Sequence, residues 1–358
     1  MSSIQEFDYA VDERRIALSP ADPRSSAKMM MIDRSSGRIE HSVFASLPHF
    51  LRKGDLVVFN SSEVLRARFL ARKTTGAELE GIFVSAEGDQ VSVWLKGKVK
   101  EGDLLNLRDR DAVRVISRTD RGAILDVSAN EFLSWLKIHG EVPLPPYIRK
   151  ERQRQKFDQT KIVDQKDYQT VFAEPGGLGS IAAPTASLHF DESLLCQIKA
   201  AGVNIEFVKL HVGLGTFEPV DVDRLDQHKM HSEMVEIPLE VQRRVQMTRE
   251  GGGRVIAVGT TVMRSLESGI LDSRWGQSAL VYETDLFIRP PYIFRAVDGL
   301  ITNFHWPRST LLVLVATFLE AQKGCCPLTL EHRWRQLYGE AFARDYRLFS
   351  YGDGMLIL

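Results

Sequence analysis

Two histidines and a glutamate stand close together in the segment DQHKMHSE, residues 226–233. His228, His231 and Glu233 are residue types that bind zinc or transfer protons near neutral pH. A zinc site needs three or four ligands, but the sequence holds no C-x-x-C and no second paired-ligand motif. The strand-like run EMVEIP, which begins at Glu233, argues against a helix with both histidines on one face. We therefore predict no metal here, and expect hydrogen-bonding and proton-transfer groups instead.

Three more of the nine histidines end strand-like segments or segments rich in small residues. They are His189 in APTASLHF, His211 in LHVGLGTF and His305 in TNFHWP. A lone histidine is more often structural than catalytic, but polar groups converge at the C-terminal ends of strands in α/β sheets. Together with His228 and His231 they make five, and we expect at least two to line one pocket.

The segment RVIAVGTTVMRSLES, residues 254–268, predicts a buried strand that runs directly into a helix. The strand would end at Gly259, and Thr260 and Thr261 would begin the helix. Free N–H groups at a helix N-terminus and threonine hydroxyls can bind an anion, such as a phosphate or an amino-acid carboxylate. Arg264, one turn further on, could add positive charge. A threonine that only caps the helix is the simpler alternative, and it does not exclude the anion site.

The usual signatures of dehydrogenases, kinases and hydrolases are missing. LHVGLGTF contains G-x-G without the third glycine of a dinucleotide fingerprint, and GGLGSIAAPT lacks the Gly-Lys-Ser/Thr of a nucleotide triphosphate loop. There is no G-x-S-x-G and no H-E-x-x-H in the sequence.

The strand and helix patterns predict an α/β chain with an inserted β unit. Short β runs separated by Gly/Asp turns fill residues 65–130, as in a small antiparallel barrel or sandwich. A helix is expected over 131–140, and VPLPPY cannot continue it. From about residue 168, helices and strands alternate. We predict a large domain of 1–64 plus 151–358 and an inserted domain of 65–150.

Composition is that of a soluble globular protein, with 44% hydrophobic and 26% charged residues among 358. The apolar run 311–321 is too short to span a bilayer and contains Glu320, and the N-terminus shows no apolar signal region. Three cysteines cannot form a disulfide framework (Cys196, Cys325 and Cys326). We expect a cytoplasmic monomer with no membrane contact.

The net charge of −1 means that any nucleic-acid contact must come from a local basic patch. The best candidate is YIRKERQRQK, residues 147–156. Its candidate tRNA-binding residues are Arg149, Lys150, Arg152 and Arg154. The alternative is a solvated loop after the PLPP turn, because most charge runs are solvated.

Several long motifs resemble the S-adenosylmethionine:tRNA ribosyltransferase-isomerase family of queuosine biosynthesis. They are GDLVVFN, EVPLPPYIRK, GSIAAPTASLHF, LHVGLGTF, QHKMHSE, GGRVIAVGTT, TDLFI, LITNFHWPRSTLL and FSYGDGMLIL. The resemblance covers essentially the whole chain. It implies a large α/β barrel-like domain that carries an inserted small antiparallel β-barrel domain.

The resemblance also implies a reaction. The family transfers the ribosyl part of S-adenosylmethionine to 7-aminomethyl-7-deazaguanine at the wobble position of tRNA and rearranges it, giving epoxyqueuosine and releasing adenine and methionine. S-Adenosylmethionine is then a substrate, and no cofactor is expected. The implied proton-transfer candidates are His189, His211, His228, His231, Glu233 and His305. The implied substrate-binding candidates are Thr185, Gly213, Gly215, Thr216, Gly259, Thr260, Thr261, Arg264, Asp285, Asn303, Tyr351 and Asp353. Tyr351 could stack on a base, with core packing as its alternative role.

One stretch departs from the family pattern. NSSEVLRAR stands where the family has NDT(K/R)V-x-P-A-R, so that Ser61, Ser62, Glu63 and Arg66 replace the usual residues. Gly354 and Pro291 are smaller departures. Two alternatives follow: a paralogue that uses S-adenosylmethionine with another acceptor, or a non-catalytic tRNA-binding relative. The intact His/Thr/Asp set argues against the second.

Overall fold

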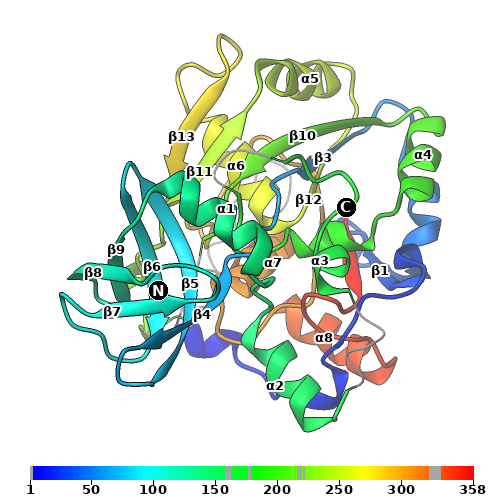
Figure 1. Cartoon of the computed structure of the whole chain (residues 1–358). Helices are drawn as coiled ribbons and strands as arrows, with labels where there is room; N and C mark the ends of the chain where they lie inside the picture. The colour runs from blue at the N-terminus through cyan, green and yellow to red at the C-terminus, as the bar shows by residue number, and fades with distance from the viewer. Residues whose placement is uncertain are drawn as a thin grey trace.

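The fold is a nine-stranded mixed sheet with helices on both faces and a separate closed β-barrel (Figure 1). The structure is a computed structural model that describes residues 3–157, 163–175, 179–213, 215, 220, 222–321 and 332–358. The strands of the large sheet are, in spatial order, β13 (Leu280–Thr284), β11 (Glu233–Ile237), β10 (Asn204–Leu210), β3 (Leu56–Asn60), β12 (Val255–Val258), β14 (Gly299–Asn303), β15 (Gly354–Ile357), β1 (Lys28–Ile32) and β2 (Ile39–Val43). The predicted α/β class is confirmed. The strands β13 and β2 form the two edges of the large sheet.

Four neighbouring strands at the centre of this sheet, β10, β3, β12 and β14, are parallel. β3 is buried along its whole length, and its alternating side chains serve two cores. Val58 packs in a core with α6 (Thr260–Gly269) and α7 (Thr310–Glu320), whereas Phe59 packs in the core on the other face with α4 (Glu192–Ala200). A parallel sheet covered on both faces requires such continuously apolar strands, which explains the run LVVFN.

The inserted unit is a closed antiparallel barrel. Its strands are β4 (Arg68–Lys73), β5 (Glu78–Glu87), β6 (Gln90–Lys96), β7 (Leu104–Leu107), β8 (Val113–Arg118) and β9 (Gly122–Asp126), and they close in the order β4-β5-β6-β9-β8-β7. Helix α1 (Ala129–His139) adds Phe132 and Trp135 to the barrel core. The small antiparallel barrel expected from the spacing of turns is therefore confirmed.

The basic segment after the PLPP turn is a helix, α2 (Pro146–Arg154), and the loop considered from the sequence is wrong. Proline suits the first turn of a helix, where its missing N–H would have no intrahelical partner. Ile148 of α2 and the preceding Leu144 pack with Tyr168 and Tyr351 of the large unit. The exact boundaries at 64/65 and 150/151 stay a prediction.

Within the described ranges, no helix is long and apolar enough to cross a membrane. The 311–321 run forms α7, an 11-residue helix buried against the sheet.

A buried carboxylate aligns the starts of two central strands. Asp55 is 1% exposed, accepts hydrogen bonds from the backbone N–H of Arg52 at 2.8 Å and of Arg254 at 3.0 Å, and pairs with the Arg254 guanidinium at 2.6 Å. Since Asp55 precedes β3 and Arg254 precedes β12, this pair fixes how the two strands begin.

We expect Asp55→Ala to lower the free energy of unfolding by about 3–5 kcal/mol, because it takes the carboxylate partner from the partly buried Arg254 guanidinium and the acceptor from two backbone N–H groups. Urea unfolding followed by far-UV circular dichroism measures this change. The matched control is Asp272→Ala, which breaks an ion pair with Arg274 at the surface. Equal urea midpoints for the two variants would contradict the role of Asp55.

Candidate active site

A pocket of about 540 Å³ opens at the C-terminal ends of the central parallel strands. Its walls come from α2, the 182–186 turn, the start of α6, the loop between β14 and α7, and the C-terminal turn at 349–350. The predicted site residues in its lining are Lys150, Thr185, Glu233, Gly259, Thr260, Thr261, Arg264, Asn303 and His305. The topology explains why these residues lie together, because the residues that follow parallel strands all lie at the same edge of the sheet.

The N-terminus of α6 faces this pocket as the sequence predicted. Gly259 ends β12 with φ 93°, a conformation that favours glycine, and lets the chain turn directly into the helix. Thr260 and Thr261 follow, and both line the pocket. The Thr261 hydroxyl oxygen is buried and has no hydrogen-bond partner among the described residues. The capping role considered from the sequence is not seen at this helix, because its N-cap residue is Gly259 and makes no side-chain cap bond.

Arg264 and Glu233 form a buried ion pair at the side of the pocket. Each side chain is 7% exposed, and the guanidinium donates to the carboxylate. Arg264 also donates to the Leu286 carbonyl at 3.0 Å, and Glu233 accepts from the Gly213 N–H at 3.3 Å. The expectation that Arg264 adds free positive charge to the anion site therefore needs correction, because Glu233 already neutralises it.

Three predicted residues form one hydrogen-bonded chain. Thr185 donates to the Asn303 side-chain oxygen at 2.9 Å, and the Asn303 amide lies 3.1 Å from His189 Nε2. His189 is buried and stacks on Phe44 with ring centroids 4.1 Å apart. Burial lowers the pKa of His189 from 6.5 to about 3, with the charges of Arg347 and Arg24 as smaller causes. The neutral ring thus orients Asn303, which itself lines the pocket.

His305 lines the pocket directly. Its Nε2 lies 2.8 Å from the Thr302 hydroxyl, and its carbonyl accepts from the Tyr9 hydroxyl at 2.6 Å. Desolvation lowers the pKa of His305. His305 is therefore placed to exchange hydrogen bonds with a ligand as a neutral imidazole.

Of the five histidines, at least two of which were expected in one pocket, His305 is in this lining and the other four are outside it. The cluster 226–233 therefore divides. His211 bridges the Gly179 carbonyl and Glu236, at 3.0 Å each. His228 contacts the Phe287 ring edge-on, and His231 lies against Gly215, where an added Cβ would approach the imidazole to 2.3 Å. Of the three residues in the cluster, Glu233 alone is among the lining residues.

Several predicted substrate-binding residues have other positions. Asp353 is buried and accepts from the backbone N–H groups of Lys28 and Arg347, which makes it a structural support of the C-terminal turn. Tyr351 is 1% exposed and packs edge-on against Tyr168, so core packing replaces the expected base stacking. Asp285 is exposed after β13, and Thr216 lies outside the described residues.

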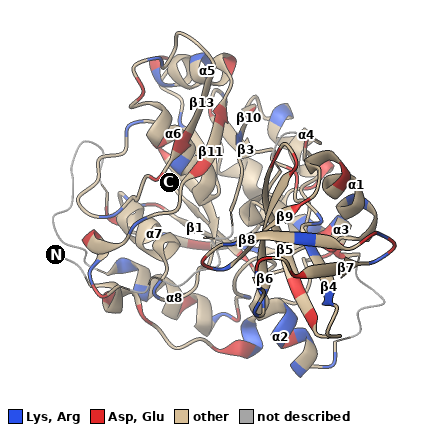
Figure 2. Cartoon of the chain, turned by 60° about the vertical axis from the view of Figure 1, so that its left-hand side comes forward, with Lys and Arg blue, Asp and Glu red and all other residues tan. Residues whose placement is uncertain are grey.

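The four basic residues predicted to bind tRNA lie on α2, where Figure 2 shows a concentration of Lys and Arg. Two of them are structural: Arg152 is buried against the Leu18 carbonyl and Asp164, and Arg149 pairs with Glu80 of the barrel. The Arg149 guanidinium is the main cause that lowers the pKa of Glu80 to about 2. Lys150, with a 76% exposed side chain, and the half-exposed Arg154 remain accessible.

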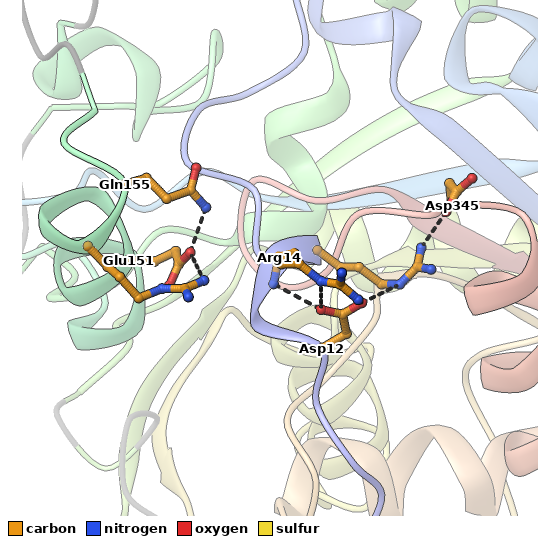
Figure 3. A network of polar contacts seen from close by, with 7 residues as sticks. Asp12, Arg14, Glu151, Gln155 and Asp345 are labelled. Carbon is orange, nitrogen blue, oxygen red and sulfur yellow. Dashed lines mark hydrogen bonds and ion pairs between the residues drawn. The ribbon is translucent and has the colours of Figure 1, made fainter.

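A polar network borders this side of the pocket (Figure 3). Arg154 and Gln155 donate to Glu151 on α2, and Arg14 donates to Asp12 on the neighbouring N-terminal segment. Arg15 pairs with both Asp12 and Asp345. The Arg15–Asp345 pair ties the N-terminal segment to the C-terminal region. The pair of Glu13 and Lys150, 3.6 Å apart at the pocket lining, ties it to α2.

The sequence reasoning missed an aromatic wall of the pocket. The Trp306 and Phe349 rings stack with centroids 4.2 Å apart, and Tyr147 meets the Trp306 ring edge-on at 5.3 Å. Arg308 and Ser309 follow Trp306 in the same lining. The one signal in the sequence was the position of WPRS, which begins at Trp306, three residues after the strand that ends at Asn303.

No group of three or more His, Cys, Asp or Glu side chains that could hold a metal ion occurs in the part of the chain that the structure describes.

The queuosine biosynthesis protein family matches residues 4–357. An S-adenosylmethionine:tRNA ribosyltransferase-isomerase from Chlorobaculum parvum is 42% identical over 99% of both chains, and one from Aquifex aeolicus is 39% identical over 99% of both. The chain belongs to this family. A crystal structure of S-adenosylmethionine tRNA ribosyltransferase from Thermotoga maritima is similar with a TM-score of 0.55 and 32% identity, covering 99% of this chain and 100% of that one.

The segment that departs from the family pattern has structural roles here. Asn60 at the end of β3 donates to the Leu210 carbonyl at 2.9 Å and accepts from the Ser62 N–H at 3.0 Å. The Ser62 hydroxyl accepts from Ser180 at 2.8 Å. Ser61 and Ser62 are buried and absent from the pocket lining. In this queuosine-family chain Ser62 therefore helps to hold Ser180 beside the end of β10, where the Ser180 hydroxyl also lies 3.3 Å from the Leu210 carbonyl.

A neutral buried His189 makes stability depend on pH. Its folded-state pKa lies below its ordinary value, so the unfolded state binds the extra proton between pH 6.5 and about 3. We expect the contribution of His189 to be fully present above pH 6.5 and to be lost progressively as the pH falls toward 3. Urea unfolding at pH 7.5 and at pH 5 measures the change. His189→Asn should show a smaller change between the two pH values, and an equal change would contradict the assignment.

Proposed function

We propose that this chain transfers and isomerises the ribosyl moiety of S-adenosylmethionine onto 7-aminomethyl-7-deazaguanine at the wobble position of tRNA, giving epoxyqueuosine-tRNA, adenine and methionine. One pocket carries the proposal. It joins a buried carboxylate, Glu233, to a helix N-terminus where the Thr261 hydroxyl has no hydrogen-bond partner among the residues that the structure describes. Full-length identity of about 40% to curated ribosyltransferase-isomerases supports the same reaction.

The chemistry needs a base. The sulfonium of S-adenosylmethionine acidifies the adjacent ribose CH₂, and a positioned carboxylate can accept that proton. We assign this role to Glu233, which lines the pocket and is held by Arg264 and the Gly213 N–H. Proton transfer by such a group contributes about 10²–10⁴-fold to a rate.

The donor also needs an anchor for its methionine carboxylate. The N-terminus of α6 offers N–H groups and the Thr261 hydroxyl, which has no partner in the described residues. Asn303, oriented by Thr185 and His189, offers an amide for a ribose hydroxyl or a base edge, and His305 is a neutral imidazole beside it. These groups bind and orient the donor, and none of them requires a cofactor.

We also propose a division into a large unit and an inserted unit, with the first boundary at 64/65 as expected from the sequence. The barrel has a hydrophobic core of its own, formed by described residues between 67 and 136, which supports a separate unit. The packing of Leu144 on the large unit favours moving the second boundary to near Gly140. We expect the protein to act as a monomer in the cytoplasm, because tRNA and S-adenosylmethionine are both present there.

The reaction is tested by incubating the protein with S-adenosylmethionine and tRNA that carries the aminomethyl-deazaguanine. Released adenine is measured by chromatography, and the modified tRNA nucleoside by mass spectrometry. No adenine with this tRNA would refute the proposal, and adenine without modified tRNA would point to another acceptor.

We expect Glu233→Gln to lower kcat for adenine release by about 10²–10⁴-fold, because the amide cannot accept the proton. The matched control is Glu236→Gln on the same strand, where the carboxylate contacts His211 outside the pocket lining. Near wild-type kcat in Glu233→Gln would remove Glu233 from the mechanism.

We expect Thr261→Val to raise KM for S-adenosylmethionine by roughly 10- to 100-fold, because a hydrogen bond to a charged group contributes about 1.5–3 kcal/mol. Ser265→Ala is the control, since this hydroxyl bonds the Thr261 carbonyl within the helix. Steady-state kinetics measures both variants, and an unchanged KM in Thr261→Val would contradict the anchor.

A further inference from the structure

Trp306 presents an aromatic surface at the mouth of the pocket. Its side chain lines the pocket and is 36% exposed, although tryptophan is normally well buried. Phe349 covers one side of the ring at a 4.2 Å centroid distance with an interplanar angle of 26°. The indole is therefore backed on one side and retains uncovered surface.

The backing of Trp306 is rigid. Phe349 is buried, and Tyr147 of α2 contacts both rings, at 5.3 Å from Trp306 and 5.2 Å from Phe349. The Tyr147 hydroxyl is bonded to the Ser350 hydroxyl at 2.5 Å. A fixed aromatic face of this kind can bind a flat heterocycle with little further loss of side-chain entropy, because its own side chain is already ordered.

The charges beside Trp306 suit a nucleotide of an RNA. Among the charged residues that line the pocket, Glu151, Glu233 and Arg264 are in ion pairs with close partners, and Lys150 lies 3.6 Å from Glu13. The Arg308 guanidinium, two residues after Trp306, has no ion pair or side-chain hydrogen bond within the described ranges. An exposed, uncompensated arginine next to an aromatic face is the pairing that binds a phosphate and its adjacent base.

The carboxylate at the same rim favours one kind of base. Glu13 is exposed beside Lys150 and lines the pocket. A guanine-type ring presents neighbouring ring and amino N–H donors on its Watson–Crick edge, which the two oxygens of one carboxylate can both accept, whereas adenine presents an amino donor beside a ring-nitrogen acceptor.

Taking the proposed function as its basis, we propose that Trp306 is the stacking platform for the flipped-out wobble base of the tRNA, with Arg308 on an adjacent backbone phosphate. The base is of the 7-deazaguanine type, and its aminomethyl group then points from the rim toward the donor in the pocket. Trp306 and Arg308 are positioning residues for the acceptor and take no part in proton transfer.

The test measures RNA affinity and donor affinity separately. The RNA probe is an anticodon stem-loop with 7-aminomethyl-7-deazaguanine at the wobble position, followed by fluorescence anisotropy, and S-adenosylmethionine binding is followed by calorimetry. We expect Trp306→Ala and Trp306→Leu to weaken RNA binding by about 5- to 150-fold, the range for loss of one stacked base, with donor binding unchanged. Trp306→Leu keeps apolar bulk against Phe349, so it decides the test where Trp306→Ala does not fold.

Two further variants sharpen the assignment. Arg308→Gln should weaken RNA binding and reduce the slope of log K against log salt by about 0.7, as for one phosphate contact on a single strand. Trp94→Leu, on strand β6 of the barrel, is the matched control and should bind RNA like the wild type.

Unchanged RNA affinity in Trp306→Leu would overturn the proposal. A variant that loses affinity for S-adenosylmethionine alone would also overturn it, because Trp306 would then stack on the adenine of the donor. Failure of the proposed function has a different signature, because the wild type would then release no adenine with the modified tRNA. A wild type that releases adenine while Trp306→Leu binds RNA normally refutes the stacking platform alone.

Discussion

Four strands at the centre of the sheet, β10, β3, β12 and β14, run in one direction, and their shared direction decides where the pocket lies. Each of the four ends at the same edge, so the residues that follow β12 and β14 meet although some forty positions separate them. Gly259 makes this possible on β12, because its positive φ turns the chain into α6 without an intervening loop. Asp55 acts at the opposite edge, where it aligns the beginnings of β3 and β12.

The buried pair of Arg264 and Glu233 links two parts of this arrangement. Glu233 begins β11 and Arg264 lies one turn into α6, so the pair fixes the helix against the antiparallel side of the sheet. A buried pair costs desolvation and is retained only with good geometry and further hydrogen bonds. Here the further bonds go to the Leu286 carbonyl and from the Gly213 N–H. The same arrangement holds a carboxylate in position at the pocket wall.

Helix α2 connects the pocket with the inserted barrel. Its residues Tyr147 and Lys150 line the pocket, while Arg149 reaches Glu80 on β5, which also pairs with Arg68 on β4. The lowered pKa of Glu80, about 2, keeps this carboxylate ionised and paired well into the acid range. The barrel is thus attached to the element that carries one wall of the pocket.

The sequence by itself determined the local elements and much of the pocket. Periodicity and turn residues identified the barrel strands, and the strand–Gly–Thr–Thr–helix pattern located the N-terminus of α6, because both depend on interactions between near neighbours in the chain. The roles within the pocket were decided only by the tertiary structure. Residue type suggested a catalytic His189, but packing on Phe44 removes water from its ring and keeps it neutral. Arg264 looked like a free cation until the fold brought Glu233, 31 positions away, against it. Nothing in the sequence linked Trp306, Phe349 and Tyr147 to one another. They lie in three segments far apart in the chain, and only the tertiary structure brings their rings into contact.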